Sequence, residues 1–477
     1  MYFYDESRGY YVRKGETFLQ ERLKDSVPGH LNNNRWRNIR DLAKAESYID
    51  VDEFTPPAGK VCVQNGVLDL DSRELQPHSP EFYFTAALQT PYERDAETDH
   101  WLGFLADSVD NEDEARKLEE FIGYCLEVWH HNREKNLFIV GPRQSGKSTY
   151  LHVLQALFGT APTVTNLTPQ QLADTQFDVA SLKEAMLNAV NDINATKIED
   201  SGTLKRIFSG ERLKLERKHQ DAHFGAPKAK HAFTANWLPS VVGQDESLYR
   251  RVLIVEFPSK VDDDDRDKDL KPKLAGGVGD NGTKYDGELS SILNRALDAR
   301  DRLHEQGGFT NDRDDTATRR KWDSWRDAHK RFLYTQFEVT GDSDDTVDKD
   351  TYYRAYKEFA GREGYELKPK QGVTKSLQWV PEIGVHDDTY SGLTWRDTDA
   401  AATTKQTGLP DAQDERVTKV LTWVDEFTTP DAAADRNALL EHAEARGCDR
   451  ATVDHTIEEL LAKGELMEPQ TGRVRRT

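Results

Sequence analysis

The chain has 477 residues, and 36% of them are apolar, which is enough to bury more than one hydrophobic core. No apolar run approaches the roughly 18 residues that a membrane span needs, and the first residues lack a secretory leader pattern. We therefore expect a cytoplasmic protein with no membrane partner. The formal net charge is -21, from 85 acidic and 64 basic residues, which argues against a chain that binds nucleic acid over its whole surface.

The acidic residues are spread along the whole chain, with runs at 262–265, 312–315 and 342–345, while basic residues cluster locally. An even acidic coat resembles that of proteins from halophilic organisms, in which high salt screens the self-repulsion. We therefore expect a halophilic protein, and local binding of DNA stays compatible with the charge.

Residues 1–130 are predicted to form a small mixed domain. They begin with alternating aromatic residues and contain the hairpin-like stretch 61–70, in which Asn65-Gly66 is a turn signal. From Trp101 to Trp129 the apolar residues recur at helical spacing, which predicts helices directly before the next segment.

Residues 137–258 alternate short apolar strands with helices, which predicts an α/β fold with a parallel sheet. Inside this stretch, Gly-Pro-Arg-Gln-Ser-Gly-Lys-Ser follows an apolar strand and precedes a helix, the pattern of a phosphate-binding P-loop. Its backbone N–H groups would wrap ATP phosphates, Lys147 would reach the β and γ oxygens, and Ser148 would ligate Mg²⁺. An ordinary glycine turn is the competing interpretation. The predicted nucleotide-binding residues are Gly141, Pro142, Arg143, Gln144, Ser145, Gly146, Lys147, Ser148 and Thr149.

A magnesium site also needs an acid at the end of a neighbouring strand. The apolar stretch 185–190 leads into Asn191 and Asp192, so Asp192 is the predicted Walker B acid and metal ligand. The alternative is that Asp192 is a loop residue or caps the next helix.

A local basic hairpin is predicted over residues 212–235, with strands at 212–217 and 228–235 around a basic tip at 218–225 that holds Lys218 and His219. In a chain that is acidic elsewhere, such a hairpin indicates DNA binding. The alternative is a solvated edge hairpin whose lysines discourage sheet aggregation.

Two further strands end or begin with polar residues. Strand 231–235 delivers Asn236 to its carboxyl end, where phosphate ligands bind in α/β sheets, so Asn236 could orient the attacking water. Arg250 and Arg251 directly precede strand 252–257, and an arginine there can be presented to the γ-phosphate of a neighbouring subunit. Pairing of these arginines with surface acids is equally compatible with the sequence.

The remaining segments carry less specific patterns. After Pro258 we expect an exposed glycine-rich loop and a helical lid that extends to residue 310. Aromatic helices and a basic turn over 320–398 predict a winged helix, as does the last module, 415–477, with helices at 417–427, 437–445 and 452–462 and a two-stranded wing. A polar linker separates the two modules.

Taken in order, these motifs resemble the superfamily-3 DNA helicases, specifically the helicase half of phage and plasmid primase-helicases and the related poxvirus protein. The resemblance extends upstream through residues 65–70 into the family's N-terminal accessory domain and downstream into the first winged helix. It implies an AAA+-like ATPase core at 131–310 in a ring, typically a hexamer. Such a ring hydrolyses ATP between its subunits and translocates on single-stranded DNA.

On this resemblance, Lys147, Asp192 and Asn236 serve catalysis, with Mg²⁺ held by Ser148 and Asp192. Either Arg250 or Arg251 is the arginine finger, and Lys218 and His219 grip DNA in the central channel. Many members place two acids together where this chain has Asn191 and Asp192, which leaves the catalytic base open. No primase active site precedes the accessory domain, so we expect a separate primase or polymerase as partner.

The leading functional hypothesis is an ATP-dependent helicase of plasmid or virus replication that acts on single-stranded and forked DNA. Two alternatives are compatible with the same residues. One is an ATP-dependent origin-binding initiator or loader, which the winged helices would suit. The other is a DNA-binding regulator that uses ATP only as a conformational switch.

Overall fold

The structure is a computed structural model of the whole chain. It divides into two compact units, Met1–Trp395 and Arg396–Thr477, which are described separately. The described residues are 1–27, 32–49, 54–127, 133–174, 179–215, 223–241, 246–261, 266–280, 282–362, 365–378, 380–396, 424, 427–428, 433–445, 450, 453–454, 457, 460–461, 466–470 and 473–476.

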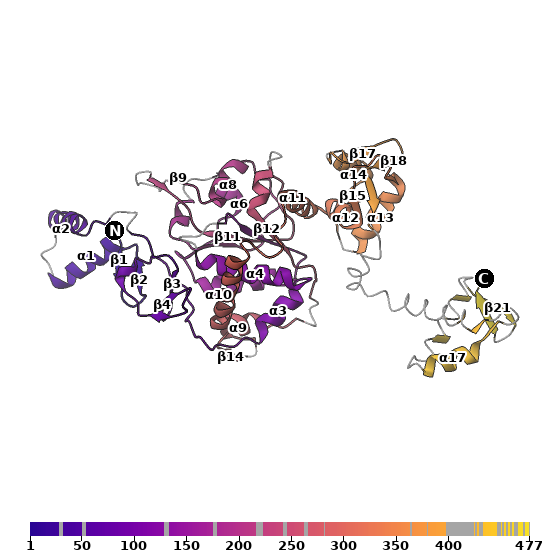
Figure 1. The fold of residues 1–477 in the computed structure, drawn as a ribbon, viewed down its shortest axis with the longest axis horizontal. Coiled ribbons are helices and arrows are strands. Elements are labelled where there is room, and N and C mark those ends of the chain that lie inside the picture. The colour runs from indigo at the N-terminus through magenta and orange to yellow at the C-terminus, as the bar shows by residue number, and fades with distance from the viewer. Residues whose placement is uncertain are drawn as a thin grey trace. The chain divides into compact units, whose positions relative to one another are not determined.

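A five-stranded parallel sheet forms the centre of the first unit (Figure 1). Its strands lie in the order β12-β6-β11-β8-β7, so the first strand in the chain is flanked by the last two. The predicted α/β class is therefore confirmed. The strands are β6 (Asn136–Val140), β7 (Val164–Thr165), β8 (Leu187–Val190), β11 (Lys230–Ala235) and β12 (Val252–Glu256).

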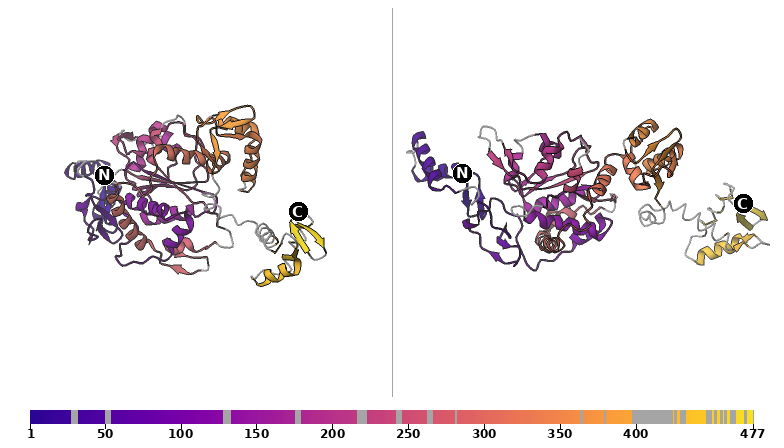
Figure 2. Two further views of the ribbon diagram at one scale, coloured as in Figure 1. Left: turned by 45° about the vertical axis from the view of Figure 1, so that its right-hand side comes forward. Right: turned by 45° about the horizontal axis from the view of Figure 1, so that its top comes forward.

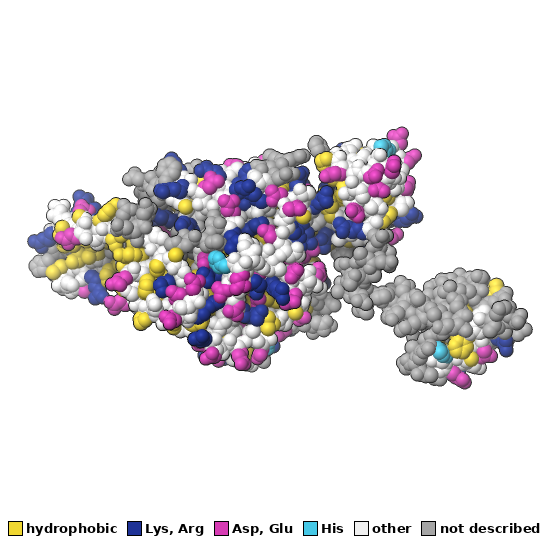
Figure 3. All heavy atoms as spheres, in the orientation of Figure 1, with side chains coloured by type: hydrophobic (Ala, Val, Ile, Leu, Met, Phe, Trp, Pro, Cys, Tyr) yellow, Lys and Arg dark blue, Asp and Glu magenta, His cyan; other side chains and the backbone are white. Residues whose placement is uncertain are grey.

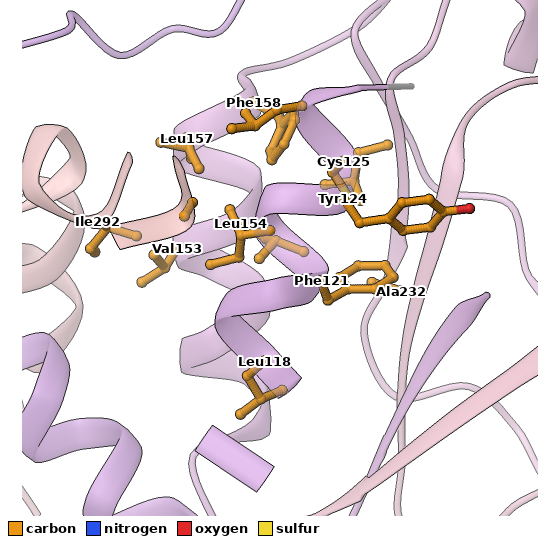
Figure 4. Close-up of a cluster of buried hydrophobic side chains, with 14 of the residues drawn as sticks. Leu118, Phe121, Tyr124, Cys125, Val153, Leu154, Leu157, Phe158, Ala232 and Ile292 are labelled. Carbon is orange, nitrogen blue, oxygen red and sulfur yellow. The ribbon is translucent and has the colours of Figure 1, made fainter. Parts of the chain in front are cut away.

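Both faces of this sheet are covered by helices, because alternate residues of each strand point to opposite sides. In β6, Leu137 and Ile139 join one buried core, while Phe138 and Val140 join the other. Figure 4 shows part of the first core, where side chains of α4, α5 and α10 meet Ala232 of the sheet. Helices on the first face are α3 (His100–Ser108), α4 (Glu112–Leu126), α5 (Lys147–Phe158), α9 (Leu270–Ala275) and α10 (Leu289–Glu305). Helices on the second face are α6 (Pro169–Asp174), α8 (Ser201–Phe208) and α11 (Asp315–Ser324).

The helix predicted as a lid is part of this core instead. In α10, Ile292, Leu293 and Ala296 are buried with α4 and α5, and Arg295 forms an ion pair with Glu119 of α4. The helical spacing of apolar residues correctly predicted that one face of this helix is buried. It could not show that α4 packs against that face. The glycine-rich segment before α10 forms a short hairpin, β13 (Gly277–Val278) with β14 (Lys284–Tyr285).

The N-terminal part contains two small sheets and a pair of helices. The predicted hairpin is present, because β3 and β4 pair antiparallel with Val63 opposite Gly66 across the turn. Figure 3 shows hydrophobic side chains gathered over this part, whereas acidic and basic side chains intermingle over the rest of that face of the first unit. The elements are β1 (Phe3–Asp5), β2 (Tyr10–Val12), α1 (Gly15–Ser26), α2 (Asn33–Glu46), β3 (Lys60–Val63), β4 (Gly66–Asp69) and β5 (Leu75–Gln76).

Residues 328–395 form a further module with its own core of Phe, Tyr and aliphatic side chains, here called the aromatic module. Trp322 and Trp325 fall within the winged helix predicted at 320–398, but this assignment was wrong, because both are buried in the core on the second face of the central sheet. The module comprises α12 (Ala328–Gln336), β15 (Phe337–Val339), β16 (Thr346–Asp348), α13 (Lys349–Arg362), α14 (Lys370–Leu377), β17 (Gly384–Val385), β18 (Thr389–Ser391) and β19 (Leu393–Trp395).

The second unit is drawn in yellow in Figure 2. It contains a three-stranded antiparallel sheet in the order β20-β22-β21. The predicted helix at 437–445 is present, whereas those at 417–427 and 452–462 lie largely outside the described residues. Over the described part of the chain, every helix is too short or too polar to cross a membrane. The elements of this unit are β20 (Ala434–Asp435), α17 (Arg436–Ala445), β21 (Leu466–Gln470) and β22 (Arg473–Arg476).

Candidate functional site

The predicted phosphate-binding loop joins β6 to the N-terminus of α5. Gln144 and Gly146 adopt left-handed backbone conformations, with φ of 65° and 91°, the kind of turn that builds concave anion-binding loops. Gly141 is required by space, since a Cβ atom there would lie 2.2 Å from the carbonyl oxygen of Phe257. Because α5 begins at Lys147, the positive end of its dipole lies at this loop.

The residues of the loop differ in exposure. Gly141, Ser145 and Lys147 are buried, whereas Arg143, Gln144 and Ser148 are exposed; Pro142, Gly146 and Thr149 are intermediate. The buried residues therefore form the base of the loop. Ser148 is an exposed residue in the first turn of α5, where its hydroxyl could hold a metal ion beside a bound phosphate.

The ammonium group of Lys147 lies at the centre of a polar cluster. Its Nζ donates to the carbonyl oxygens of Gly141 and Pro142, at 2.9 and 2.5 Å, and lies 3.3 Å from Ser145 Oγ. It also donates to Oδ1 of Asn236, at 3.2 Å. Burial lowers the pKa of Lys147 to about 8, although the charge of Asp192 acts in the opposite direction.

Asn236 connects Lys147 with the predicted Walker B acid. Its Nδ2 donates to Oδ1 of Asp192 at 2.9 Å. The backbone of Asp192 is left-handed, with φ of 56°, and its N–H donates to the hydroxyl of Thr234 at 2.8 Å. That hydroxyl in turn donates to the side chain of Asn191 at 2.8 Å. Three strands, β6, β8 and β11, thus deliver one connected set of polar groups at their carboxyl ends.

The connectivity of the sheet places the loop at a point where the chain changes faces. After β6 the chain enters α5 on the first face, whereas after β11 it continues through Leu238 and Leu248 on the second face. The two segments therefore diverge from adjacent strands to opposite faces. In open α/β sheets, ligands bind at such a point, beside the carboxyl ends of the strands. Asp192 and Ser148 are the residues there with oxygen donors suited to a divalent cation.

The two predicted arginines differ in burial and in their contacts. Both lie in the short 3-10 helix η3 (Glu246–Arg251). Arg251 is buried and donates to Ser209 Oγ at 2.6 Å and to the carbonyl of Ser247 at 2.5 Å, and it pairs with Glu134 at 3.1 Å. Arg250 has 55% of its side chain exposed and approaches Glu134 only to 4.0 Å. Arg251 therefore holds the turn in place, while Arg250 extends from it.

The predicted basic hairpin is only partly correct. Strand β9 (Leu213–Leu215) pairs antiparallel with β10 (His223–Gly225), which lies in the segment predicted as the tip. The predicted second strand, 228–235, instead supplies β11 of the central parallel sheet, because its buried residues pair with β6 and β8. Lys218 and His219, the predicted DNA-binding residues, lie outside the described residues.

Two residues of the site were given no role in the sequence-based prediction. Thr234, together with Asn191, fixes the backbone of Asp192, and Glu134 anchors η3. A polar Thr between Phe233 and Ala235 was a usable signal for the first of these, because a buried hydroxyl needs a partner. Glu134 carries no such signal, since it lies in a polar run before β6.

Comparison with known proteins gives two family matches. Residues 1–110 match a family model described as "D5 N terminal like", and residues 139–251 match a family of unknown function, DUF5906. No curated protein matches the chain. The similar solved structures include the A form apo structure of the NrS-1 C terminal region, with 12% identity, a TM-score of 0.34, and 65% of this chain and 78% of that chain covered. The apo structure of the NrS-1 C terminal region (305–718) has 12% identity and a TM-score of 0.33, with 64% of this chain and 78% of that chain covered. These TM-scores are too low to carry an argument about this chain.

The parallel sheet and its carboxyl-edge site are consistent with an α/β nucleotide-binding core. The D5 N-terminal-like match covers residues 1–110, which lie within the segment predicted to be the N-terminal accessory domain.

Proposed function

We propose that this chain is an ATP-dependent DNA helicase that acts in plasmid or virus DNA replication. The observation that carries the proposal is the hydrogen-bonded series from Lys147 through Asn236 to Asp192, at the junction of the glycine loop and α5. Each of these groups has a task in ATP hydrolysis, and they converge although 89 residues separate the first two in sequence.

In this proposal the loop 141–149 binds the ATP phosphates through its backbone N–H groups. The Lys147 ammonium exchanges its carbonyl partners for the β and γ oxygens. Ser148 and Asp192 would hold Mg²⁺, which neutralises the charge on the phosphates and orients them. Asn236 holds the attacking water or senses the γ-phosphate through an amide that Asp192 already orients.

The exposed side chain of Arg250 is the proposed arginine finger and acts on ATP bound to the adjacent subunit of a ring. The buried contacts of Arg251 make it unsuitable for this task, because it would have to break them to reach a neighbour. The hairpin β9–β10, with Lys218 and His219, would line the channel of the ring and contact single-stranded DNA.

The experiment that tests the proposal is ATP hydrolysis by the purified full chain in high salt, with and without single-stranded DNA. Wild type is compared with Lys147→Ala and with Lys284→Ala, which removes an exposed lysine of the β13–β14 hairpin as a matched control. We expect turnover that rises with DNA, is lost in Lys147→Ala and is kept in Lys284→Ala. Turnover that ignores DNA, or that survives Lys147→Ala, contradicts the proposal.

Strand displacement on a forked substrate then separates a helicase from an initiator or loader. A helicase displaces the strand processively, whereas an initiator hydrolyses ATP and remodels its site without processive displacement.

A further inference from the structure

The two strands that flank β6 end at the same level as the phosphate-binding loop begins. In the sheet register, Val140 lies opposite Ala235 of β11 on one side and opposite Glu256 of β12 on the other. Asn236 follows directly after the first of these strands. A residue that contacts the ends of both β11 and β12 could therefore fix the position of Asn236 relative to the phosphate-binding loop.

Trp325, which follows α11, makes these contacts. It is 2% exposed, and its indole Nε1 donates to the carboxylate of Glu256. Its carbonyl oxygen accepts from the N–H of Leu238 at 2.7 Å, and its ring lies 6.0 Å from the ring of Trp237, the residue after Asn236. Trp325 thus bridges the ends of β11 and β12.

The aromatic module contributes the other half of this arrangement. Arg331 of α12 pairs with Glu256 at 2.7 Å, and its guanidinium lies 4.2 Å from the centre of the Trp325 ring. Tyr365 of the same module places its ring 5.1 Å from that of Trp237. The module is therefore attached at both strand ends, once through charge and once through an aromatic contact.

The buried charge gives this arrangement a defined geometry. The Glu256 side chain is 12% exposed and also pairs with Lys321 at 2.5 Å. Burial alone would raise the pKa of Glu256, but Lys321 and Arg331 outweigh it and hold the pKa at about 2. Loss of Arg331 would leave Lys321 as the remaining cation beside this buried carboxylate and would weaken the junction.

We propose that Trp325 and Arg331 are positioning residues for Asn236, through which the aromatic module controls the rate of ATP hydrolysis. The inference rests on the proposed function. A shift of the module that draws Arg331 from Glu256 removes the cation above the Trp325 ring and one charge partner of Glu256, and it reaches Asn236 through the neighbouring Trp237. We expect the rate to change more than nucleotide affinity, because the side chains of Trp325 and Arg331 contact the strand ends, and the loop 141–149 is linked to them through the bond from Lys147 to Asn236.

The test compares Arg331→Gln with Arg326→Gln in the full chain, with Arg331→Lys as the conservative variant. Arg326 is adjacent to Trp325 in sequence but pairs with Asp323, so it is the matched control. We expect Arg331→Gln to lower kcat about tenfold while the Kd for ATP stays within about twofold, and Arg331→Lys to recover part of kcat. Hydrogen exchange of the peptide containing Leu238 should speed up in Arg331→Gln only, since its N–H bonds to Trp325.

Three results would overturn the inference: an unchanged kcat in Arg331→Gln, a Kd that weakens in proportion to kcat, or an equal loss in Arg326→Gln. Faster exchange at Leu238 with full turnover would also overturn it, because the junction would then be loosened without any effect on Asn236. Wild type without any turnover would instead refute the proposed function, so the two failures are distinguishable.

Discussion

The amide oxygen of Asn236 accepts a hydrogen bond from Lys147 at 3.2 Å, and its amide nitrogen donates to Asp192 at 2.9 Å. This orientation fixes which end of the amide faces each partner. Aspartate in place of Asn236 would face Asp192 with a second negative charge, and alanine would leave both partners without their bond.

Asn236→Ala should therefore lower kcat by about 100-fold, the size expected for loss of one oriented donor in a phosphate or oxyanion site, with little change in Kd for ATP. Steady-state turnover and nucleotide titration give the two quantities. A change confined to Kd would mean that Asn236 acts in binding alone.

Arg250 and Arg251 should respond in opposite ways to substitution. Arg250→Ala should lower turnover by about 10³-fold without changing the melting temperature, because the side chain is exposed and would act on the neighbour's ATP. Arg251→Ala should lower the melting temperature, because it leaves Glu134 and Ser209 without their buried partner.

Mixing Arg250→Ala subunits with Lys147→Ala subunits tests whether Arg250 acts on the ATP of a neighbouring subunit. Assemblies of Arg250→Ala with Lys147→Ala subunits should regain part of the turnover, since some interfaces then pair an intact loop with an intact finger. No recovery would contradict action between subunits.

Gly141→Ala should disrupt the loop. The added Cβ would meet a backbone carbonyl, that of Phe257, at 2.2 Å, and a backbone atom cannot move away cheaply. We expect the free energy of unfolding to fall by about 1–3 kcal/mol. ATP binding should weaken as well. Gly103→Ala is the matched control, since nothing lies within 4 Å of its added Cβ. Alanine has a higher helix propensity than glycine, so helix α3 should become slightly more stable. Equal melting temperatures for the two variants would contradict the tight contact.

ATP affinity should depend on pH through Lys147. Burial lowers the pKa of Lys147 to about 8, and the charged form binds phosphate, so affinity should fall by up to about tenfold per unit as pH rises above 8. Folding stability should increase with pH between 8 and 10.5. In this range the folded Lys147 has lost its proton, whereas the lysine of the unfolded chain still holds it.

Binding calorimetry in buffers of different ionisation heat should detect proton uptake on ATP binding near pH 8. In Lys147→Arg this uptake should vanish, because a guanidinium does not titrate in this range. Uptake of the same size in both proteins would assign the titration to another group.

The sequence predicted the glycine loop, Asp192 and Asn236 because each lies at a strand end, and strand ends are marked by a change from apolar to polar residues. It misassigned Trp322 and Trp325, since an aromatic residue at helical spacing shows that a face is buried but not which core receives it. Glu256 was also missed as a junction, because its partners lie 65 to 75 residues further along the chain and their convergence depends on the tertiary fold. The DNA-binding role of Lys218 and His219 stays a prediction.

The left-handed backbone at Asp192 has a practical consequence. Among residues with a side chain, asparagine and aspartate adopt this conformation most readily, whereas β-branched residues are strained there. Asp192→Asn should thus keep the fold of the loop and its bond to Asn236 while removing the charge that a metal ion needs. Such a variant would be the reagent of choice for trapping a nucleotide-bound assembly in a form stable enough to visualise.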